Sequence, residues 1–188
     1  MMKKSKIDKR ARLIEAANKL VQQQGFNQTT LADIAEESKV PLGNVYYYFK
    51  TKDDIGHALI EHRTEGVCSQ FREWDKLPDP RKRLLAVIKA VANNRDILAQ
   101  SGCPIGSLSQ ELHKDGGPMA DKAAGMFTVL LEWLETQFRL LGTGRESSSH
   151  AFHLLSALQG ASLLTNAFND PALMLRETAR LKQWVNSI

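Results

Sequence analysis

The spacing of apolar residues predicts helices along the whole chain. In residues 7–24 and again in residues 53–76, apolar side chains recur at intervals of three and four, as they do on one face of a helix. No segment shows the strict alternation that is typical of a β-strand. We therefore expect an all-α protein with about nine helices, the others covering residues 31–38, 42–49, 81–100, 104 to about 114, 119–141, 147–168 and 172–185.

Two short helices stand close together near the amino terminus. Thr30 can cap a helix over residues 31–38, and Asp33, three residues further on, completes an approximate capping box. Pro41 disfavours helical backbone at the residue before it and suits the first turn of a second helix over about residues 42–49. With the preceding amphipathic helix as a brace, this pair predicts a helix-turn-helix, a structure that reads DNA.

The second short helix presents side chains that suit a DNA groove. Val45 and Phe49 lie four residues apart and are expected to face the first helix, which leaves the other side chains for the surface. Asn44 can pair bidentately with adenine, while tyrosine offers a hydroxyl to phosphate and a ring to the thymine methyl group. Three successive tyrosines could instead be core, but consecutive helix positions point about 100° apart, so one neighbour cannot bury all three. The resulting candidates for contact with DNA are Gly43, Asn44, Tyr46, Tyr47, Tyr48, Lys50 and Lys52.

A combined pattern in the first 60 residues consists of Gly25-Phe26, Thr29-Thr30, Leu31, Ile34-Ala35, Val40, Gly43, Val45-Tyr46, Tyr48-Phe49 and Lys52. By this pattern, the first 60 residues resemble the DNA-binding domain of TetR-family transcriptional regulators. By this likeness, four residues are expected to contact phosphates, namely Thr30, Tyr46, Tyr48 and Lys52. Four others are expected nearer the bases, namely Leu42, Gly43, Asn44 and Tyr47.

Positive charge is concentrated in the amino-terminal segment. The formal net charge is +4, but residues 1–52 hold ten Lys and Arg against five Asp and Glu, which leaves −1 for the remainder. This distribution favours an anionic partner for the first segment, with nucleic acid expected and a membrane surface as the alternative. Residues 1–9 are expected to form a solvated basic arm. They lack the apolar run of a signal peptide, and no stretch is long enough to span a bilayer, so we expect a cytoplasmic protein.

The sequence divides into two expected domains. Residues 1–52 are expected to bind DNA, and residues 53–188 to bind an effector and to dimerise. On the helix over residues 147–168, a stripe of apolar and small residues is wide enough for both a core and a partner. A twofold pair would place two recognition helices about 34–36 Å apart, which predicts a homodimer on a palindromic operator. The resemblance also implies dimerisation through the last two helices, and the expected interface residues are Leu154, Leu158, Ala161, Thr165 and Phe168.

Several residues of the second domain are candidates for a signal-binding site. His62 lies among apolar neighbours on the helix over residues 53–76 and could contact an effector, with a hydrogen-bonded core histidine as the favoured alternative. An apolar cavity for a small-molecule effector could be lined by Phe71, Trp74, Phe127, Leu130 and Trp133. Plain core is the alternative, and it is favoured for most of these five residues.

Cys103 is the candidate for an electrophile sensor. Pro104 fits the first position of a helix and puts Cys103 at its cap, where the helix dipole favours the reactive thiolate. Ser101-Gly102-Cys103 also resembles a segment of some TetR-like regulators, including electrophile-sensing ones. The alternative is a buried cysteine that fills space as a small apolar side chain. His150 and His153 lie three residues apart, but with too few other ligands nearby we expect no metal and no cofactor.

Together these features favour a ligand-responsive, DNA-binding transcriptional regulator. The simplest version is a repressor that a small molecule or an electrophile releases from its operator, since repression is the commoner outcome among TetR-like regulators. The alternative is a helical protein that binds DNA without sequence preference or serves as a scaffold. We expect no enzyme, because no motif combines a nucleophile, a base and an orienting group.

Overall fold

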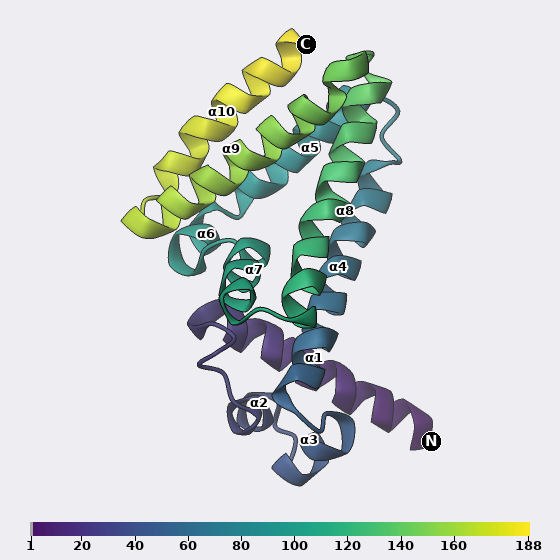
Figure 1. The fold of residues 1–188 in the computed structure, drawn as a ribbon, viewed down its shortest axis with the longest axis vertical. Helices are drawn as coiled ribbons and strands as arrows, with labels where there is room; N and C mark the ends of the chain where they lie inside the picture. Colours follow the sequence, from purple (N-terminus) through teal and green to yellow (C-terminus); the bar gives the residue numbers. More distant parts are fainter. Residues whose placement is uncertain (1) are drawn as a thin grey trace. The chain divides into compact units, whose positions relative to one another are not determined.

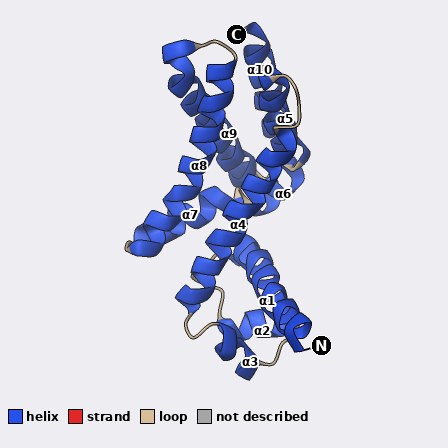
Figure 2. Ribbon diagram, turned by 90° about the vertical axis from the view of Figure 1, so that its right-hand side faces the viewer, coloured by secondary structure: helices blue, strands red, loops and turns tan. Residues whose placement is uncertain are grey.

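The computed structural model describes residues 2–188, with side chains described from Lys9 onward. Within residues 2–188 the backbone forms ten α-helices and one short 3₁₀ segment, with no strand (Figures 1 and 2). The all-α fold class is therefore confirmed. The elements are α1 (Met2–Gln24), α2 (Leu31–Ser38), α3 (Leu42–Tyr48), α4 (Lys52–Trp74), α5 (Pro80–Asn93), α6 (Arg95–Ser101), α7 (Pro104–Asp115), α8 (Pro118–Leu140), η1 (Gly144–Glu146), α9 (Ser147–Phe168) and α10 (Pro171–Ser187).

The single helix expected over residues 81–100 is interrupted at Asn94. The Asn94 N–H donates to the carbonyl of Val91, and the Asn94 side-chain amide donates to the carbonyl of Ala90. A side chain that bonds to the preceding turn competes with the regular helical pattern. This competition ends α5 and lets α6 begin as a separate helix, which accounts for the one helix more than expected.

The first helix is longer than expected. α1 begins at Met2, whereas the apolar spacing predicted a start near Ile7. Residue 1 and the side chains of residues 2–8 lie outside the described part of the chain. The role expected for residues 1–9, a solvated basic arm, falls largely on these side chains and stays a prediction.

The helices form two compact units. The first comprises Met1–Glu65 and Ser107–Met126, and the second comprises Gly66–Gly106 and Phe127–Ile188. Helices α4, α7 and α8 each contribute residues to both units. This grouping does not test the functional boundary expected after residue 52, which stays a prediction.

The first unit contains the helix-turn-helix predicted from the sequence. Val45 and Phe49 turn inward as expected, and neither residue is more than 3% exposed. Each large apolar side chain buried in this way contributes about 1.5–3 kcal/mol to the stability of the unit. The core that joins α1, α2, α3 and the start of α4 consists of Leu13, Ile14, Ala16, Ala17, Ile34, Ala35, Val40, Val45, Phe49, Ile55 and Ala58.

Capping boxes fix the first residues of two helices in this unit. At α2 the Asp33 N–H donates to Thr30 Oγ1 (3.2 Å) and the Thr30 N–H donates to Asp33 Oδ2 (2.9 Å), which confirms the expected capping box. At α4 the Asp54 N–H donates to Thr51 Oγ1 (3.1 Å) and the Thr51 N–H donates to Asp54 Oδ2 (2.9 Å). The helices on either side of α3 therefore begin at defined positions.

The carboxylates of Asp33 and Asp54 should make the stability of the first unit depend on pH. Hydrogen bonds from the backbone N–H groups of Thr30 and Thr51 hold the pKa of Asp33 and the pKa of Asp54 below their ordinary values. Because the folded-state pKa is the lower one, this stabilisation is complete above about pH 4 and is lost as the pH falls through the folded-state values. We expect the thermal midpoint, measured by circular dichroism, to fall as the pH is lowered below about 4.

A pair of variants tests the assignment of this pH dependence. Asp33→Asn/Asp54→Asn should have a lower midpoint at neutral pH and a smaller further decrease in acid, because its capping groups no longer titrate. The control Glu36→Gln/Asp53→Asn removes two exposed carboxylates of the same unit that lie outside the capping boxes and should keep the parental pH dependence. If the capping variant and the parent lost stability equally in acid, the assignment would be wrong.

The second unit is a helical bundle around a separate core. Helices α9 and α10 run side by side, and α10 also packs against α5 and α6 (Figure 1). Its most buried apolar residues include Leu84, Ile88, Leu134, Phe138, Leu154, Leu158, Leu181 and Val185. Of the helices within residues 2–188, none combines the length and the apolar character that crossing a bilayer requires.

Candidate nucleic-acid interface

Helix α3 carries the exposed aromatic and apolar residues of the first unit. Among the described side chains of this unit, the large hydrophobic residues that are exposed are Leu42 (41%), Tyr46 (47%) and Tyr47 (60%). Asn44 lies on the same short helix and is half-buried. A Cβ added at Gly43 would meet nothing within 4 Å, so the backbone there is open to close approach. The structure thus gathers on one helix the residues expected nearest the bases, in an exposed cluster of the kind that marks binding surfaces.

The three tyrosines fall into two groups. Tyr46 and Tyr47 are exposed, so the alternative that all three are core is wrong for these two. Tyr48 is half-buried and packs against the core of the first unit. The rings of Tyr47 and Tyr48 meet edge to face, with centroids 5.1 Å apart and planes at 86°. Tyr48 therefore supports the exposed ring of Tyr47, and its expected contact with phosphate stays a prediction.

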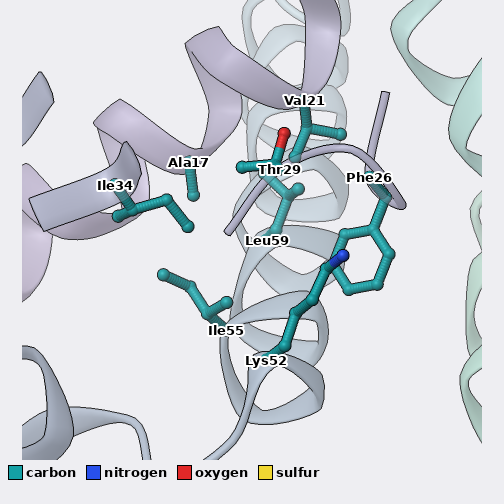
Figure 3. Close-up of a pocket in the computed structure, with 8 residues that line it drawn as sticks. All are labelled: Ala17, Val21, Phe26, Thr29, Ile34, Lys52, Ile55 and Leu59. Atoms are coloured by element: carbon teal, nitrogen blue, oxygen red, sulfur yellow. The ribbon is translucent and has the colours of Figure 1, made fainter. Parts of the chain in front are cut away.

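Lys52 and Thr30 have partners within the unit. The Lys52 ammonium donates to the Asn27 carbonyl (2.9 Å) and lies 4.7 Å from the centre of the Phe26 ring. Figure 3 shows the Lys52 side chain reaching the Phe26 ring. The space lined by these side chains and the nearby core has no volume left for a water molecule. Thr30 caps α2 but remains exposed, and Lys50 is exposed as well. Phosphate contacts by Thr30, Lys50 and Lys52 stay predictions, and Lys52 also supports the turn after α1.

Two basic residues of α1 have structural roles that the sequence pattern did not indicate. The Arg12 guanidinium donates to the Ser38 carbonyl and, at 3.4 Å, to the Lys39 carbonyl, where α2 ends. Lys19 pairs with Glu37 at 2.7 Å. Arginine and lysine at the carboxyl end of a helix satisfy carbonyls and complement the helix dipole. Part of the positive charge of the first segment therefore joins α1 to α2.

The candidate effector residues of the second unit are packed against one another. Phe71 and Trp133 stack at 4.3 Å between centroids with planes 6° apart, which leaves no space for a ligand between the two rings. The Trp133 indole N–H donates to Asp75 Oδ1 at 3.1 Å. Phe127 and Leu130 are half-buried against the same core. This arrangement matches the alternative of plain core, and effector binding at these residues stays a prediction.

The two remaining effector candidates have different surroundings. His62 is exposed, so the favoured alternative of a hydrogen-bonded core histidine is wrong, and its contact with an effector stays a prediction. Cys103 Sγ accepts the Gly106 N–H at 3.4 Å, which confirms that the thiol lies at the first turn of α7. The side chain is half-buried and also packs against Leu98, Ala161 and Met174. The Cys103 thiol therefore caps α7, as expected, and also fills space in an apolar cluster, as the alternative has it.

The expected dimer residues lie mainly on the inner face of α9. Leu154, Leu158, Ala161 and Thr165 are at most 8% exposed within this one chain, so they do not lie on its surface. The fifth residue, Phe168, is 70% exposed. The expected stripe is the side of α9 that faces the core, and the adjacent side carries the exposed apolar residues. This exposed face consists of Phe152, Leu163, Leu164 and Phe168, with the small residues Ser156, Gly160 and Ala167 between them.

Comparison with known families gives a match at the helix-turn-helix. Residues 13–59 match the family model described as "Bacterial regulatory proteins, tetR family". The chain is 38% identical over 84 residues to the HTH-type transcriptional regulator TtgR of Pseudomonas putida, a match that covers 42% of this chain and only 40% of TtgR. It is 26% identical over 179 residues to the uncharacterized HTH-type transcriptional regulator YxaF of Bacillus subtilis, covering 92% of this chain and 94% of YxaF.

Solved structures extend the similarity to nearly the whole chain at the level of fold. A TetR transcriptional regulator from Chloroflexus aurantiacus superposes with a TM-score of 0.85, covering 97% of this chain and 96% of that one at 16% identity. Such low identity shows a shared fold alone. All three of these proteins are described as transcriptional regulators, in agreement with the expectation that the chain is not an enzyme.

Proposed function

Because this chain belongs to the TetR family of DNA-binding transcriptional regulators, we propose that it is a repressor that binds a palindromic operator as a homodimer. The observation that carries the proposal is the exposed cluster on α3, where Leu42, Tyr46 and Tyr47 are open to solvent beside Asn44. The capping box at Thr30 and the inward packing of Val45 hold this helix in place. A rigid helix with polar and aromatic residues on its outer side suits the major groove.

The proposed contacts divide into those that read bases and those that position the protein. Asn44 would pair with adenine, and the Tyr47 ring would lie against a thymine methyl group, with Leu42 and Gly43 beside them. Contacts to phosphate carry no sequence information but supply much of the affinity. The residues proposed for phosphate are Thr30, Tyr46, Tyr48, Lys50 and Lys52.

The homodimer is proposed through the exposed face of α9. Phe152, Leu163, Leu164 and Phe168 present a continuous apolar surface that a monomer would leave in water. Small residues between them permit close approach of a second helix. A twofold pair would present two copies of α3 about one turn of DNA apart, which is why a palindromic site is proposed.

The proposed release signal acts on the second domain. A small molecule or an electrophile would bind or modify residues there, and α4, which continues from the first unit into the second, would pass the change to α3. Cys103 is the proposed site for an electrophile, because its thiol caps α7 and remains half-exposed.

Binding to selected and random DNA tests the proposal. Duplexes that the protein retains from a random pool should contain an inverted repeat and should bind about 1,000-fold or more tightly than a random duplex of equal length. Affinity for both should fall steeply with salt, because bound phosphates release counterions. An in vitro transcript placed behind the selected site should decrease when the protein is added. Equal affinity for selected and random duplexes at every salt concentration would favour the alternative of a nonspecific DNA-binding or scaffolding protein.

A further inference from the structure

A carboxylate from α7 binds the backbone of the turn that follows α1. The Phe26 N–H donates to Glu111 Oε2 at 2.8 Å, and the Asn27 N–H donates to Glu111 Oε1 at 2.6 Å. Gly25 has φ +85°, a conformation that lets the next two N–H groups point in one direction. Successive N–H groups in such a turn form a concave site for an anion. Both oxygens of Glu111 are therefore used to hold this turn.

The same turn is held by neighbouring side chains. The Asn27 amide donates to Asp115 Oδ2 at 3.1 Å, one helical turn beyond Glu111 on α7. The Lys52 ammonium donates to the Asn27 carbonyl from the start of α4. The turn thus has polar contacts with α7 on one side and α4 on the other.

Apolar packing and an ion pair, both between α4 and other parts of the first unit, reinforce these polar contacts. The Phe26 ring lies against α4 at Gly56, where an added Cβ would come within 2.9 Å of Phe26 Cζ and 2.6 Å of Met119 Sδ. Lys122 on α8 pairs with Glu61 on α4 at 2.6 Å. Residues 107–126 thus pack onto the other segment of the first unit, although they lie far from it in sequence.

We propose that Glu111 is a positioning residue for DNA binding. From the turn, the chain passes through Thr29, which is 1% exposed and donates its hydroxyl to the Gly25 carbonyl at 2.7 Å. It then reaches Thr30, the cap of α2, and α2 packs on α3. Fixing the Phe26 and Asn27 amides therefore fixes the start of α2 and, through it, the orientation of α3. This inference rests on the proposed function and adds a residue that does not touch DNA.

Two variants with the same net charge separate the effect of the Glu111 hydrogen bonds on DNA affinity from the effect of removing one negative charge. Glu111→Gln keeps the size of the side chain but replaces one of the two accepting oxygens with an NH2 group, which cannot accept a backbone N–H. Asp121→Asn removes one exposed negative charge from the same unit. Loss of negative charge alone should leave DNA affinity unchanged or raise it, because phosphate is repelled less. We expect Glu111→Gln to bind the selected duplex about 10-fold more weakly than the parent, the opposite direction.

Fold is monitored by circular dichroism, and the assay is run at a temperature at which parent and both variants are folded. If Glu111→Gln bound the selected duplex as tightly as Asp121→Asn, the inference would be overturned.

A second measurement keeps the inference testable apart from the proposed function. Hydrogen exchange of the Phe26 and Asn27 amides, followed by NMR without DNA, should be at least about 10-fold faster in Glu111→Gln than in the parent or in Asp121→Asn. If the parent showed no preference for any duplex, the proposed function would fail, and this exchange alone would decide whether Glu111 holds the turn. Unchanged exchange in Glu111→Gln would overturn the inference in either case.

Discussion

The double variant Asn44→Ala/Tyr47→Ala should bind the selected duplex at least about 30-fold more weakly than the parent, with its thermal midpoint lowered by only a few degrees. Each contact to a base edge or a thymine methyl group contributes about 1–3 kcal/mol of discrimination, so two losses amount to at least about 2 kcal/mol. Affinity for a random duplex should change little, because phosphate contacts remain. The small stability loss reflects the ring contact between Tyr47 and Tyr48, worth about 0.5–1.5 kcal/mol.

Two controls define this result, measured by fluorescence anisotropy on both duplexes. Asn93→Ala removes an exposed asparagine from α5 in the second unit and should bind like the parent. Lys50→Ala should weaken binding to selected and random duplexes alike and should reduce the salt dependence. A double variant that still distinguished the two duplexes as well as the parent does would exclude α3 as the reading surface.

The second large effect is expected at the exposed face of α9. Phe152→Asp/Leu163→Asp should be monomeric at concentrations at which the parent is a dimer, with the dimer dissociation constant raised by at least about 100-fold. Two carboxylates placed in an apolar interface would be buried without partners, which costs about 3 kcal/mol or more. Both positions are exposed in the single chain, so its fold should be retained. Binding to a palindrome should weaken, while binding to one half-site should not change.

Sedimentation velocity measures the association directly. Leu140→Asp makes the same chemical change at a leucine that is 59% exposed at the end of α8 and is not one of the proposed interface residues, so it should leave the dimer intact. If the α9 variant sedimented as the parent does, the proposed interface would be wrong. If the Leu140 variant also dissociated, the effect of the α9 substitutions would not be specific.

Local sequence could predict the features that depend on contacts between residues only a few positions apart. The Thr30–Asp33 capping box depends on two side chains three positions apart. The inward side of α3 follows from the spacing of Val45 and Phe49. The position of Cys103 at the first turn of α7 follows from the proline after it. In each case the partners are neighbours in the chain, so no tertiary information was needed.

The orientation of α9 was decided by tertiary packing instead. This helix has apolar residues on more than one side, so its periodicity could not tell the face toward the core from the face toward solvent. Leu154 and Leu158 face the core because α5 and α10 provide buried neighbours there. Phe152 and Leu163 are equally apolar in sequence, yet they are exposed. The expected interface residues therefore lie mainly on the inner face of α9, and a dimer contact through this helix stays a prediction.

The contact made by Glu111 had no signal in the sequence. Its partners, the backbone amides of Phe26 and Asn27, lie 85 and 84 positions away. Backbone amides are present at every residue except proline, so their identity gives no hint of the partner. A single glutamate on an amphipathic helix is most simply read as a solvated residue. Only the fold, which packs α7 onto the turn after α1, shows what this carboxylate holds.

The distribution of aromatic residues gives each unit its own spectroscopic signal. All three tyrosines of the chain lie on α3 in the first unit, whereas all three tryptophans, Trp74, Trp133 and Trp184, lie in the second. Emission excited where only tryptophan absorbs therefore reports the environment of the second unit alone. The tyrosine bands of the near-ultraviolet dichroism, recorded without DNA, come from α3 alone. Melting of the two units can thus be compared in unlabelled protein, and tryptophan emission reports how the second unit responds to added DNA or to thiol reagents.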